Sequence, residues 1–168
     1  LENMLNAHVE TYHLLKASPG SEKVKIGLVK NIFQFDPLRR WHLLDWAFSK
    51  ILNDVYTNAP LQFLKTGKSS FYMPGMVDNE MLNPEAPGTL DFIGLNYYSR
   101  MHVKGRLNPE EPFVFDTRQQ DIMTDMGYPL YAEGFYRALK TISDVGVPIY
   151  VTENGLADDK DTVRPLFI

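Results

Sequence analysis

The sequence predicts an α/β fold in which a parallel sheet is covered by helices. Three short apolar runs have the composition of strands, and longer stretches with a helical period separate them along the chain. The runs are almost continuously apolar, which is typical of strands buried on both faces of a parallel sheet. No internal repeat or low-complexity tract interrupts this order, so we expect one structural unit without antiparallel hairpins.

The chain is expected to begin with a helix and a strand. A helix is predicted over residues 2–17, where apolar side chains recur every three or four positions until a Ser-Pro-Gly sequence ends the pattern. The apolar run at residues 23–29, with the sequence KVKIGLV, is expected to form the first strand.

Two further helices are expected before the second strand. Residues 38–56 have an apolar face and an opposite charged face that includes Asp45, and Trp46 is interpreted as a packing residue of this helix. A shorter helix is predicted over residues 60–67, because proline suits the first helical turn and glycine the C-terminal cap. The apolar face of the longer helix consists of Trp41, Leu44, Phe48, Ile51, Leu52 and Val55.

The second half of the chain repeats the alternation of strand and helix. Residues 89–100 are expected to form a strand, and residues 101–128, which are rich in Pro, Asp and Glu, a long loop. A helix is predicted over residues 130–145, ended by glycine. The sequence VPIYVTENGL at residues 147–156 is then expected to form a buried third strand that carries Glu153 at its tip.

Composition excludes several classes of function. The chain has 168 residues and a formal net charge of −4 without a long basic block, which argues against nucleic acid or an anionic membrane surface as its partner. No run approaches 18 consecutive apolar residues. The absence of cysteine excludes disulfides and thiol catalysis and favours a reducing compartment such as the cytoplasm. Since His8, His13 and His42 have no second ligand at metal spacing, we expect neither a metal nor a cofactor.

If the three strands are parallel, their carboxyl ends meet at one edge of the sheet. This edge, which we call the carboxyl-end rim, is where α/β proteins place their sites. It would gather residues 31–35, 96–100 and 152–155, which include a carboxylate, three asparagines and several aromatic residues. Aromatic rings stack on the apolar faces of sugars, and Asn and Glu pair with sugar hydroxyls. The rim therefore favours a saccharide ligand.

Three stretches carry a resemblance to a known family. The sequence YVTENGLAD at residues 150–158 resembles the nucleophile motif of glycoside hydrolase family 1, the retaining β-glycosidases. The sequence DFIGLNYYSR at residues 91–100 resembles a preceding strand of that family, and AHVETYHLLK at residues 7–16 resembles the helix after its acid/base motif. The tetrapeptide TENG is moderately specific by itself, but all three stretches occur in the family order.

The resemblance implies a (β/α)8 TIM barrel, which needs roughly 250 residues. We therefore expect a partial barrel of three parallel strands with their connecting helices. Residues 1–168 would be part of a single glycosidase barrel domain, incomplete at both ends and covering roughly strands five to seven. In the family order, the acid/base glutamate would precede Leu1, and a Trp-rich strand would follow Ile168.

The resemblance also assigns roles to individual residues. Glu153 is expected to be the nucleophile, with the Tyr98 phenol as a hydrogen-bond donor that keeps the carboxylate ionised and oriented. Asn96 and Asn154 are expected to bind the substrate, a β-linked glucoside or related saccharide, with Asn96 bordering the same carboxylate. Where the family commonly has tryptophan, this sequence has Tyr128, which bears on fine specificity.

Plainer interpretations stay open at this point. Glu153 could be a solvated residue at a strand end, and Tyr98 could be a packing residue, as we expect for Tyr97. The chain could then belong to a non-catalytic carbohydrate-binding or interaction protein derived from a glycosidase barrel. The sequence does not indicate the sugar, the leaving group or the oligomeric state.

Overall fold

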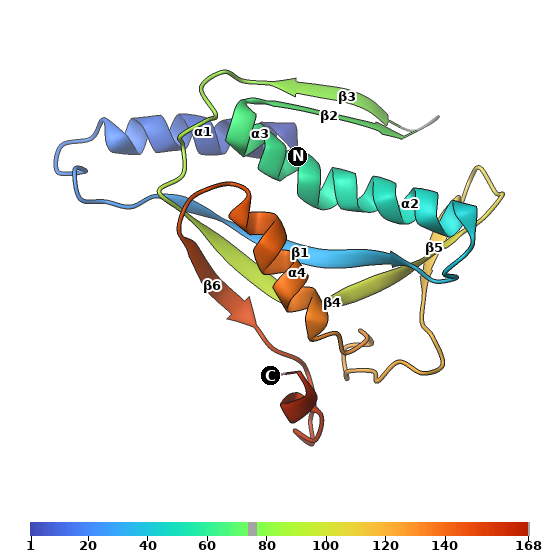
Figure 1. The fold of residues 1–168 in the computed structure, drawn as a ribbon. Helices are drawn as coiled ribbons and strands as arrows, with labels where there is room; N and C mark the ends of the chain where they lie inside the picture. The colour runs from blue at the N-terminus through green and yellow to red at the C-terminus, as the bar shows by residue number, and fades with distance from the viewer. Residues whose placement is uncertain (74–76, 168) are drawn as a thin grey trace.

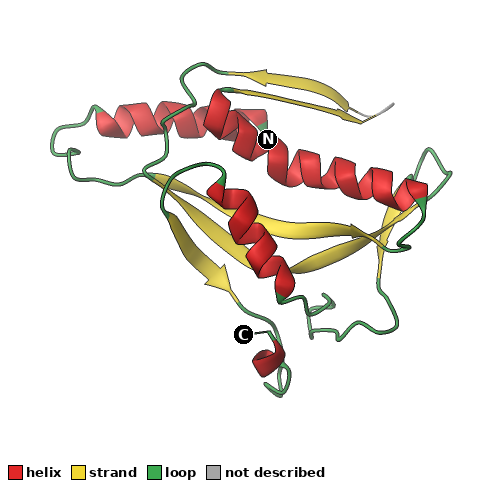
Figure 2. Cartoon of the chain, in the orientation of Figure 1, coloured by secondary structure: helices red, strands yellow, loops and turns green. Residues whose placement is uncertain are grey.

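The computed structural model describes residues 1–73 and 77–167 as a sheet with helices packed on one face (Figures 1 and 2). A π-helix at Asp54–Asn58 joins two of the helices, and a short 3-10 helix, Arg164–Leu166, lies near the C-terminus. The remaining elements, in chain order, are α1 Glu2–Lys16, β1 Gly27–Pro37, α2 Leu43–Asn53, α3 Ala59–Thr66, β2 Lys68–Met73, β3 Val77–Leu82, β4 Phe92–Gly105, β5 Phe113–Asp116, α4 Glu133–Ser143 and β6 Ile149–Asn154.

Strand β4 is the centre of the main sheet. It pairs in parallel with β1 along one edge and in parallel with β6 along the other, while β5 pairs antiparallel with its C-terminal end. The predicted α/β fold with three parallel strands is therefore confirmed. The described residues form an open sheet and not a closed barrel.

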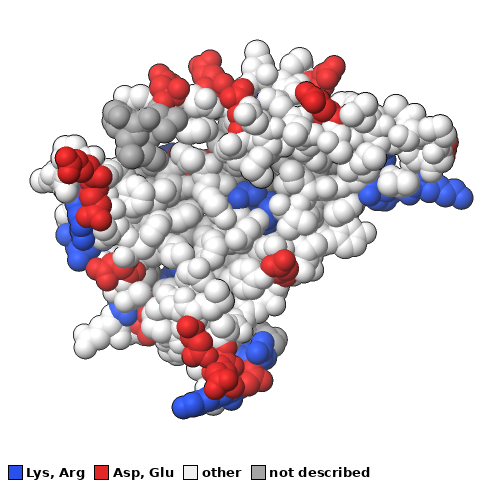
Figure 3. All heavy atoms as spheres, turned by 180° about the vertical axis from the view of Figure 1, so that it is seen from behind, with Lys and Arg blue, Asp and Glu red and all other residues white. Residues whose placement is uncertain are grey.

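The hydrophobic core lies between the sheet and its helices. Ile93, Leu95 and Tyr97 of β4 are fully buried, and they belong to the same cluster as Phe63 of α3 and Ile142 of α4. In the described part of the chain no helix covers the other face of the sheet, and Figure 3 shows a broad neutral surface with charged side chains mainly around its margin. None of the helices described for residues 1–73 and 77–167 combines the length and the apolarity needed to cross a membrane.

Several predicted boundaries are wrong. The first strand was predicted over residues 23–29, but β1 begins at Gly27 and continues to Pro37. The long helix predicted from residue 38 begins at Leu43, and a π-helix and α3 continue it to Thr66. The α3 prediction is confirmed, since this helix ends at Thr66 and Gly67 caps it in the left-handed conformation with φ 73°.

The expectation of a fold without antiparallel hairpins is also wrong. Strands β2 and β3 form an antiparallel hairpin of their own (Figure 1). The stretch predicted as a loop, residues 101–128, contains the end of β4 and all of β5. In β2, Ser69 is buried while Lys68 and Ser70 are exposed, so side chains alternate between the two faces as in any strand. Because these three residues are all polar, the sequence shows no alternation of apolar and polar residues from which the strand could be predicted.

The predicted orientation of the second helix needs correction. Trp41 precedes α2 and is 87% exposed, and Trp46 is 56% exposed, so neither is the packing residue that the periodicity predicts. Asp45, expected on the charged outer face, is fully buried. The reason is a specific set of donors: Asp45 accepts hydrogen bonds from the Arg39 guanidinium at 2.6 and 2.9 Å and from the Gly105 N–H at 2.8 Å.

These donors also decide the charge state of Asp45. Burial by itself raises the pKa of the carboxyl, but the hydrogen bonds from Arg39 and from the Gly105 N–H outweigh it and lower the pKa to about 2. An ionised Asp45 thus holds the start of α2 against the end of β4. Gly105 permits the close approach, because a Cβ there would lie 2.6 Å from the Cβ of Leu44.

Strand β6 is more exposed than its apolar sequence predicts. Tyr150 is 59% exposed and Val151 is 47% exposed, although the run was expected to be buried. Among the described residues, β6 pairs with β4 along one edge only. Its other edge has no partner strand among these residues, which explains why its apolar side chains are exposed.

We expect the 168-residue chain in isolation to self-associate. An open strand edge with apolar side chains is a template for pairing with another chain, and a charged side chain on the edge opposes that pairing. Sedimentation velocity over a range of concentrations should show oligomers that Val151→Lys reduces.

The matched control is Leu107→Lys, because Leu107 is 92% exposed in a loop outside the strands. This variant should associate as the parent chain does. A monomeric parent chain with one cooperative thermal transition would contradict the prediction.

Candidate active site

The carboxyl ends of β4 and β6 bring two predicted site residues into contact. Asn96 of β4 stands opposite Glu153 of β6 in the parallel register. Two residues further along β4, the Tyr98 phenol donates a hydrogen bond to Oε2 of Glu153. These two residues are 55 positions apart in the sequence, and the pairing of the strands is what joins them.

An irregularity in β6 determines the face on which Glu153 lies. Between Leu95 and Asn96 the pairing advances one residue on β4 and two on β6, so Thr152 is an additional residue in the manner of a β-bulge. With strict alternation, Glu153 would stand opposite Tyr97, whose side chain is fully buried among the helices. The additional residue instead places Glu153 on the face that carries the Asn96 side chain.

The two asparagines make different contacts. Asn96 accepts a hydrogen bond from the Thr152 hydroxyl through Oδ1 at 2.6 Å, which ties the additional residue to β4. Asn154 donates from Nδ2 to the Tyr97 carbonyl at 3.0 Å, so its amide nitrogen is engaged by the neighbouring strand. Substrate binding through Asn96 and Asn154 stays a prediction.

Tyr97 is a packing residue, as expected. Its ring is fully buried and stacks with Phe135 of α4 at a centroid distance of 5.8 Å. Its hydroxyl donates to the Tyr131 carbonyl at 2.6 Å, and burial raises the pKa of the Tyr97 phenol strongly. Adjacent tyrosines on β4 therefore serve opposite faces of the sheet, Tyr97 the core and Tyr98 the carboxylate.

A cavity of about 340 Å³ adjoins the Tyr98–Glu153 pair. Tyr98 belongs to both features, because its side chain lines the cavity and bonds Glu153. The lining is mainly apolar, and two of its rings, Phe33 and Tyr128, pack at a centroid distance of 5.4 Å. Among the other lining residues are Asn31, Met126, Gly155 and Leu156.

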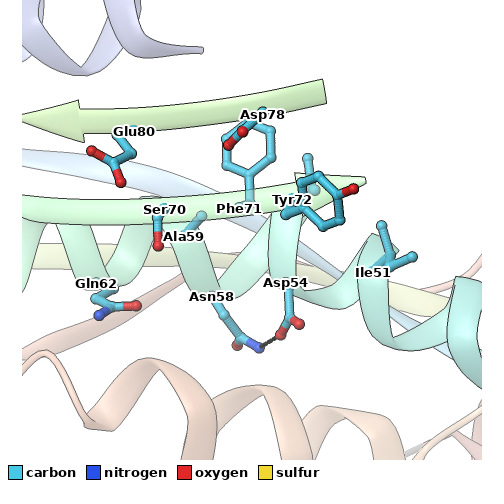
Figure 4. A pocket seen from close by; sticks show the side chains of 11 residues that line it. Ile51, Asp54, Asn58, Ala59, Gln62, Ser70, Phe71, Tyr72, Asp78 and Glu80 are labelled. Carbon is cyan, nitrogen blue, oxygen red and sulfur yellow. Dashed lines mark hydrogen bonds between the residues drawn. The ribbon is translucent and has the colours of Figure 1, made fainter. Parts of the chain in front are cut away.

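A second cavity, of about 560 Å³, lies between α2, α3 and the β2–β3 hairpin (Figure 4). Its lining includes Asp54, Asn58, Asp78 and Glu80, and Asn58 donates to Asp54 at 2.8 Å. None of the predicted site residues lines it. Among the described residues, no cluster of His, Asp and Glu side chains is arranged to hold a metal ion.

The histidines named from the sequence have structural contacts. One ring nitrogen of His8 lies 2.8 Å from the Thr89 carbonyl, and one of His13 lies 3.4 Å from the Glu85 carbonyl. His42 immediately precedes α2. His8 and His13 thus tie α1 to the segment that precedes β4.

A largely buried ionic network beside the rim was not predicted from the sequence. Arg100 of β4 lies 3.7 Å from Asp36 of β1 and 3.4 Å from Asp121, whose carboxylate also lies 3.2 Å from the His102 ring. Arg137 of α4 approaches Asp36 at 3.3 Å. The available signal was the charged SRMHVK sequence, which the prediction divided between a strand and a loop.

The Tyr98 phenol is held as a neutral donor. The hydrogen bond to the Glu153 carboxylate, followed by burial, raises the pKa of Tyr98 above its ordinary value. A phenol that keeps its proton can direct it at one carboxylate oxygen and leave the other available. This arrangement suits a carboxylate that must stay oriented while it reacts.

Parallel strands that gather a carboxylate, a phenol and an aromatic-lined cavity at their carboxyl ends define part of an α/β-barrel protein with its site at the rim. Comparison with known proteins identifies the family. A model of glycosyl hydrolase family 1 matches residues 1–165, and the chain belongs to this family.

Similar proteins include glycosidases of Pyrococcus and Thermotoga. The chain is 37% identical to a β-galactosidase of Pyrococcus woesei, covering 99% of this chain and 37% of the relative. It is 30% identical to β-glucosidase A of Thermotoga maritima, covering 95% of this chain and 37% of that relative. The solved structure of a β-glycosidase from Pyrococcus horikoshii superimposes with a TM-score of 0.77 at 31% identity. The match covers 99% of this chain and 37% of that one. The chain thus spans little more than a third of each, as expected for part of a TIM barrel.

In a Glu153→Gln variant, we expect the Tyr98 phenol to ionise at lower pH than in the parent protein. The amide removes the negative charge that opposes loss of the phenol proton, so the pKa of Tyr98 falls toward its ordinary value. Carbon-13 NMR of labelled tyrosine Cζ measures this titration, with Tyr98→Phe assigning the resonance.

The internal control is Tyr56, whose pKa is raised chiefly by burial and should not respond to Glu153→Gln. If the Tyr98 titration also stays unchanged, the hydrogen bond to Glu153 does not form in solution.

Proposed function

We propose that this protein hydrolyses β-glycosidic bonds by a retaining double displacement in which Glu153 is the nucleophile. The observation that carries the proposal is the hydrogen bond from Tyr98 to Glu153 at the carboxyl-end rim. Membership of glycosyl hydrolase family 1 supports the reaction class. We also propose that residues 1–168 are part of one barrel domain, since the relatives are longer than this chain.

The chemistry needs two carboxyl groups roughly 5–5.5 Å apart. In the first step an oxygen of Glu153 bonds to the anomeric carbon, the bond to the leaving oxygen breaks, and a second carboxylic acid protonates that oxygen. In the second step water, deprotonated by the same second group, displaces Glu153 from the sugar. By resemblance to the family, the second group is a glutamate outside these 168 residues.

Tyr98 contributes by orienting the nucleophile. Its phenol binds Oε2 of Glu153, so Oε1 is the oxygen that remains for attack. Fixing the carboxylate before the reaction removes rotational freedom that would otherwise be lost in the transition state. The Asn96–Thr152 hydrogen bond supports the same geometry, because it holds the additional residue that turns Glu153 toward Tyr98.

The substrate we propose is a β-linked glucoside or a related saccharide such as a galactoside. The similar proteins include a β-galactosidase and a β-glucosidase, which supports this class of sugar without selecting one member. Since Oδ1 of Asn96 is engaged with Thr152, a contact with a sugar hydroxyl would use its amide nitrogen. The apolar cavity bounded by Phe33 and Tyr128 would receive the leaving group.

We expect a 2-fluoro β-glycoside to label Glu153 covalently in the full-length protein. Such a substrate forms the glycosyl–enzyme ester faster than water can hydrolyse it, so the adduct accumulates and peptide mass spectrometry locates it. Glu153→Gln should lower kcat by about 10⁴-fold or more, because the amide cannot form the intermediate.

The control for the labelling experiment is a variant that keeps the Glu153 carboxylate but lacks the Tyr98 hydroxyl that donates to it. Tyr98→Phe should still be labelled at Glu153, only more slowly, because the nucleophile is present but less well oriented. Labelling of any other carboxylate would rule out the assignment.

A further inference from the structure

Two turns from different parts of the chain form walls of the cavity beside Glu153. One is the turn at residues 122–130, which contributes Thr124, Met126 and Tyr128 to the lining. The other is the segment after β6, which contributes Leu156 and Ala157. The width of the cavity therefore depends on how the two turns are held relative to each other.

Asp125 connects the two turns in both directions. Its backbone N–H donates to the Ala157 carbonyl at 3.0 Å. In return, its carboxylate Oδ2 accepts a hydrogen bond from the Asp159 N–H at 2.5 Å. Asp125 is flanked by Thr124 and Met126, so this connection is made within the cavity wall.

Each turn is ordered by its own hydrogen bonds. In the first, the Thr124 hydroxyl donates to the Tyr128 carbonyl at 3.0 Å, and Gly127 takes the left-handed conformation with φ 75°. In the second, the Asp158 carboxylate accepts the Val163 N–H at 2.8 Å. Since each turn is internally fixed, the Asp125 bonds set the position of one relative to the other.

We propose that Asp125 is a positioning residue that sets the width of this cavity and thereby the preference for the leaving group. The inference rests on the proposed function, because the cavity adjoins the proposed nucleophile. Asp125 itself is exposed and contacts no reacting atom. It acts on Tyr128, three residues further along the same turn, whose ring packs against Phe33.

The test compares a large aromatic leaving group with a small one in the full-length protein. Asp125→Ala should lower kcat/KM for 4-nitrophenyl β-glucoside about three- to tenfold, which is the range for loss of one such hydrogen bond. It should leave kcat/KM for methyl β-glucoside unchanged, because methanol does not fill the cavity. Hydrolysis of the glycosyl–enzyme ester should also be unchanged, since the leaving group has departed by then.

Two variants separate positioning from a general loss of structure. Asp125→Asn keeps an acceptor oxygen and should restore most of the lost kcat/KM. Asp159→Ala removes a negative charge from the partner turn but keeps the donating N–H, so its kinetics should match the parent protein. Hydrogen exchange at the Asp159 amide should accelerate in Asp125→Ala.

The outcomes distinguish the inference from the proposed function. An equal loss of kcat/KM on both glycosides, or an unchanged Asp159 amide, would overturn the positioning role while leaving the glycosidase activity in place. A parent protein that hydrolyses neither glycoside would overturn the proposed function, and the inference with it.

Discussion

The position of β4 between two parallel neighbours is the constraint on which the candidate site depends. Its residues Ile93, Leu95 and Tyr97 are fully buried under the helices, so a slip by one residue would expose these side chains and bury their polar neighbours. The register with β1 and β6 is therefore strongly specified. Because both pairings are parallel, the carboxyl ends of the three strands meet, and Tyr98 reaches Glu153 from the adjacent strand.

The residue types at the rim were predictable from the sequence, but the face of the sheet on which each side chain lies was not. The apolar run before Glu153 and the motif around Tyr98 are local signals, and the structure brings both residues together. Alternation along β6 would nevertheless direct Glu153 toward the helices, opposite Tyr97. The additional residue at Thr152 reverses this, and its hydroxyl bond to Asn96 is a tertiary contact that no local pattern contains.

The errors at α2 and β6 have a common physical origin. Hydrophobic periodicity predicts which side chains can be buried, and the partners that are present decide which of them are. Asp45 is buried because Arg39 and Gly105 supply donors from outside the helix, whereas Trp41 precedes the helix and stays exposed. Val151 is apolar and half exposed because the open edge of β6 has no neighbour among the described residues.

Parallel pairing over long sequence separations also bears on the order in which the site can form. A parallel connection needs a crossover, so β6 can join β4 only after α4 and the preceding loop have been synthesised. Loops of this length are slow to close, which delays contacts between distant segments. Tyr98 leaves the ribosome 55 residues before Glu153, and β6 is the last of the strands described in this chain. During synthesis the phenol is thus present long before its carboxylate, and the candidate pair can assemble only after the other described strands of the sheet have been made.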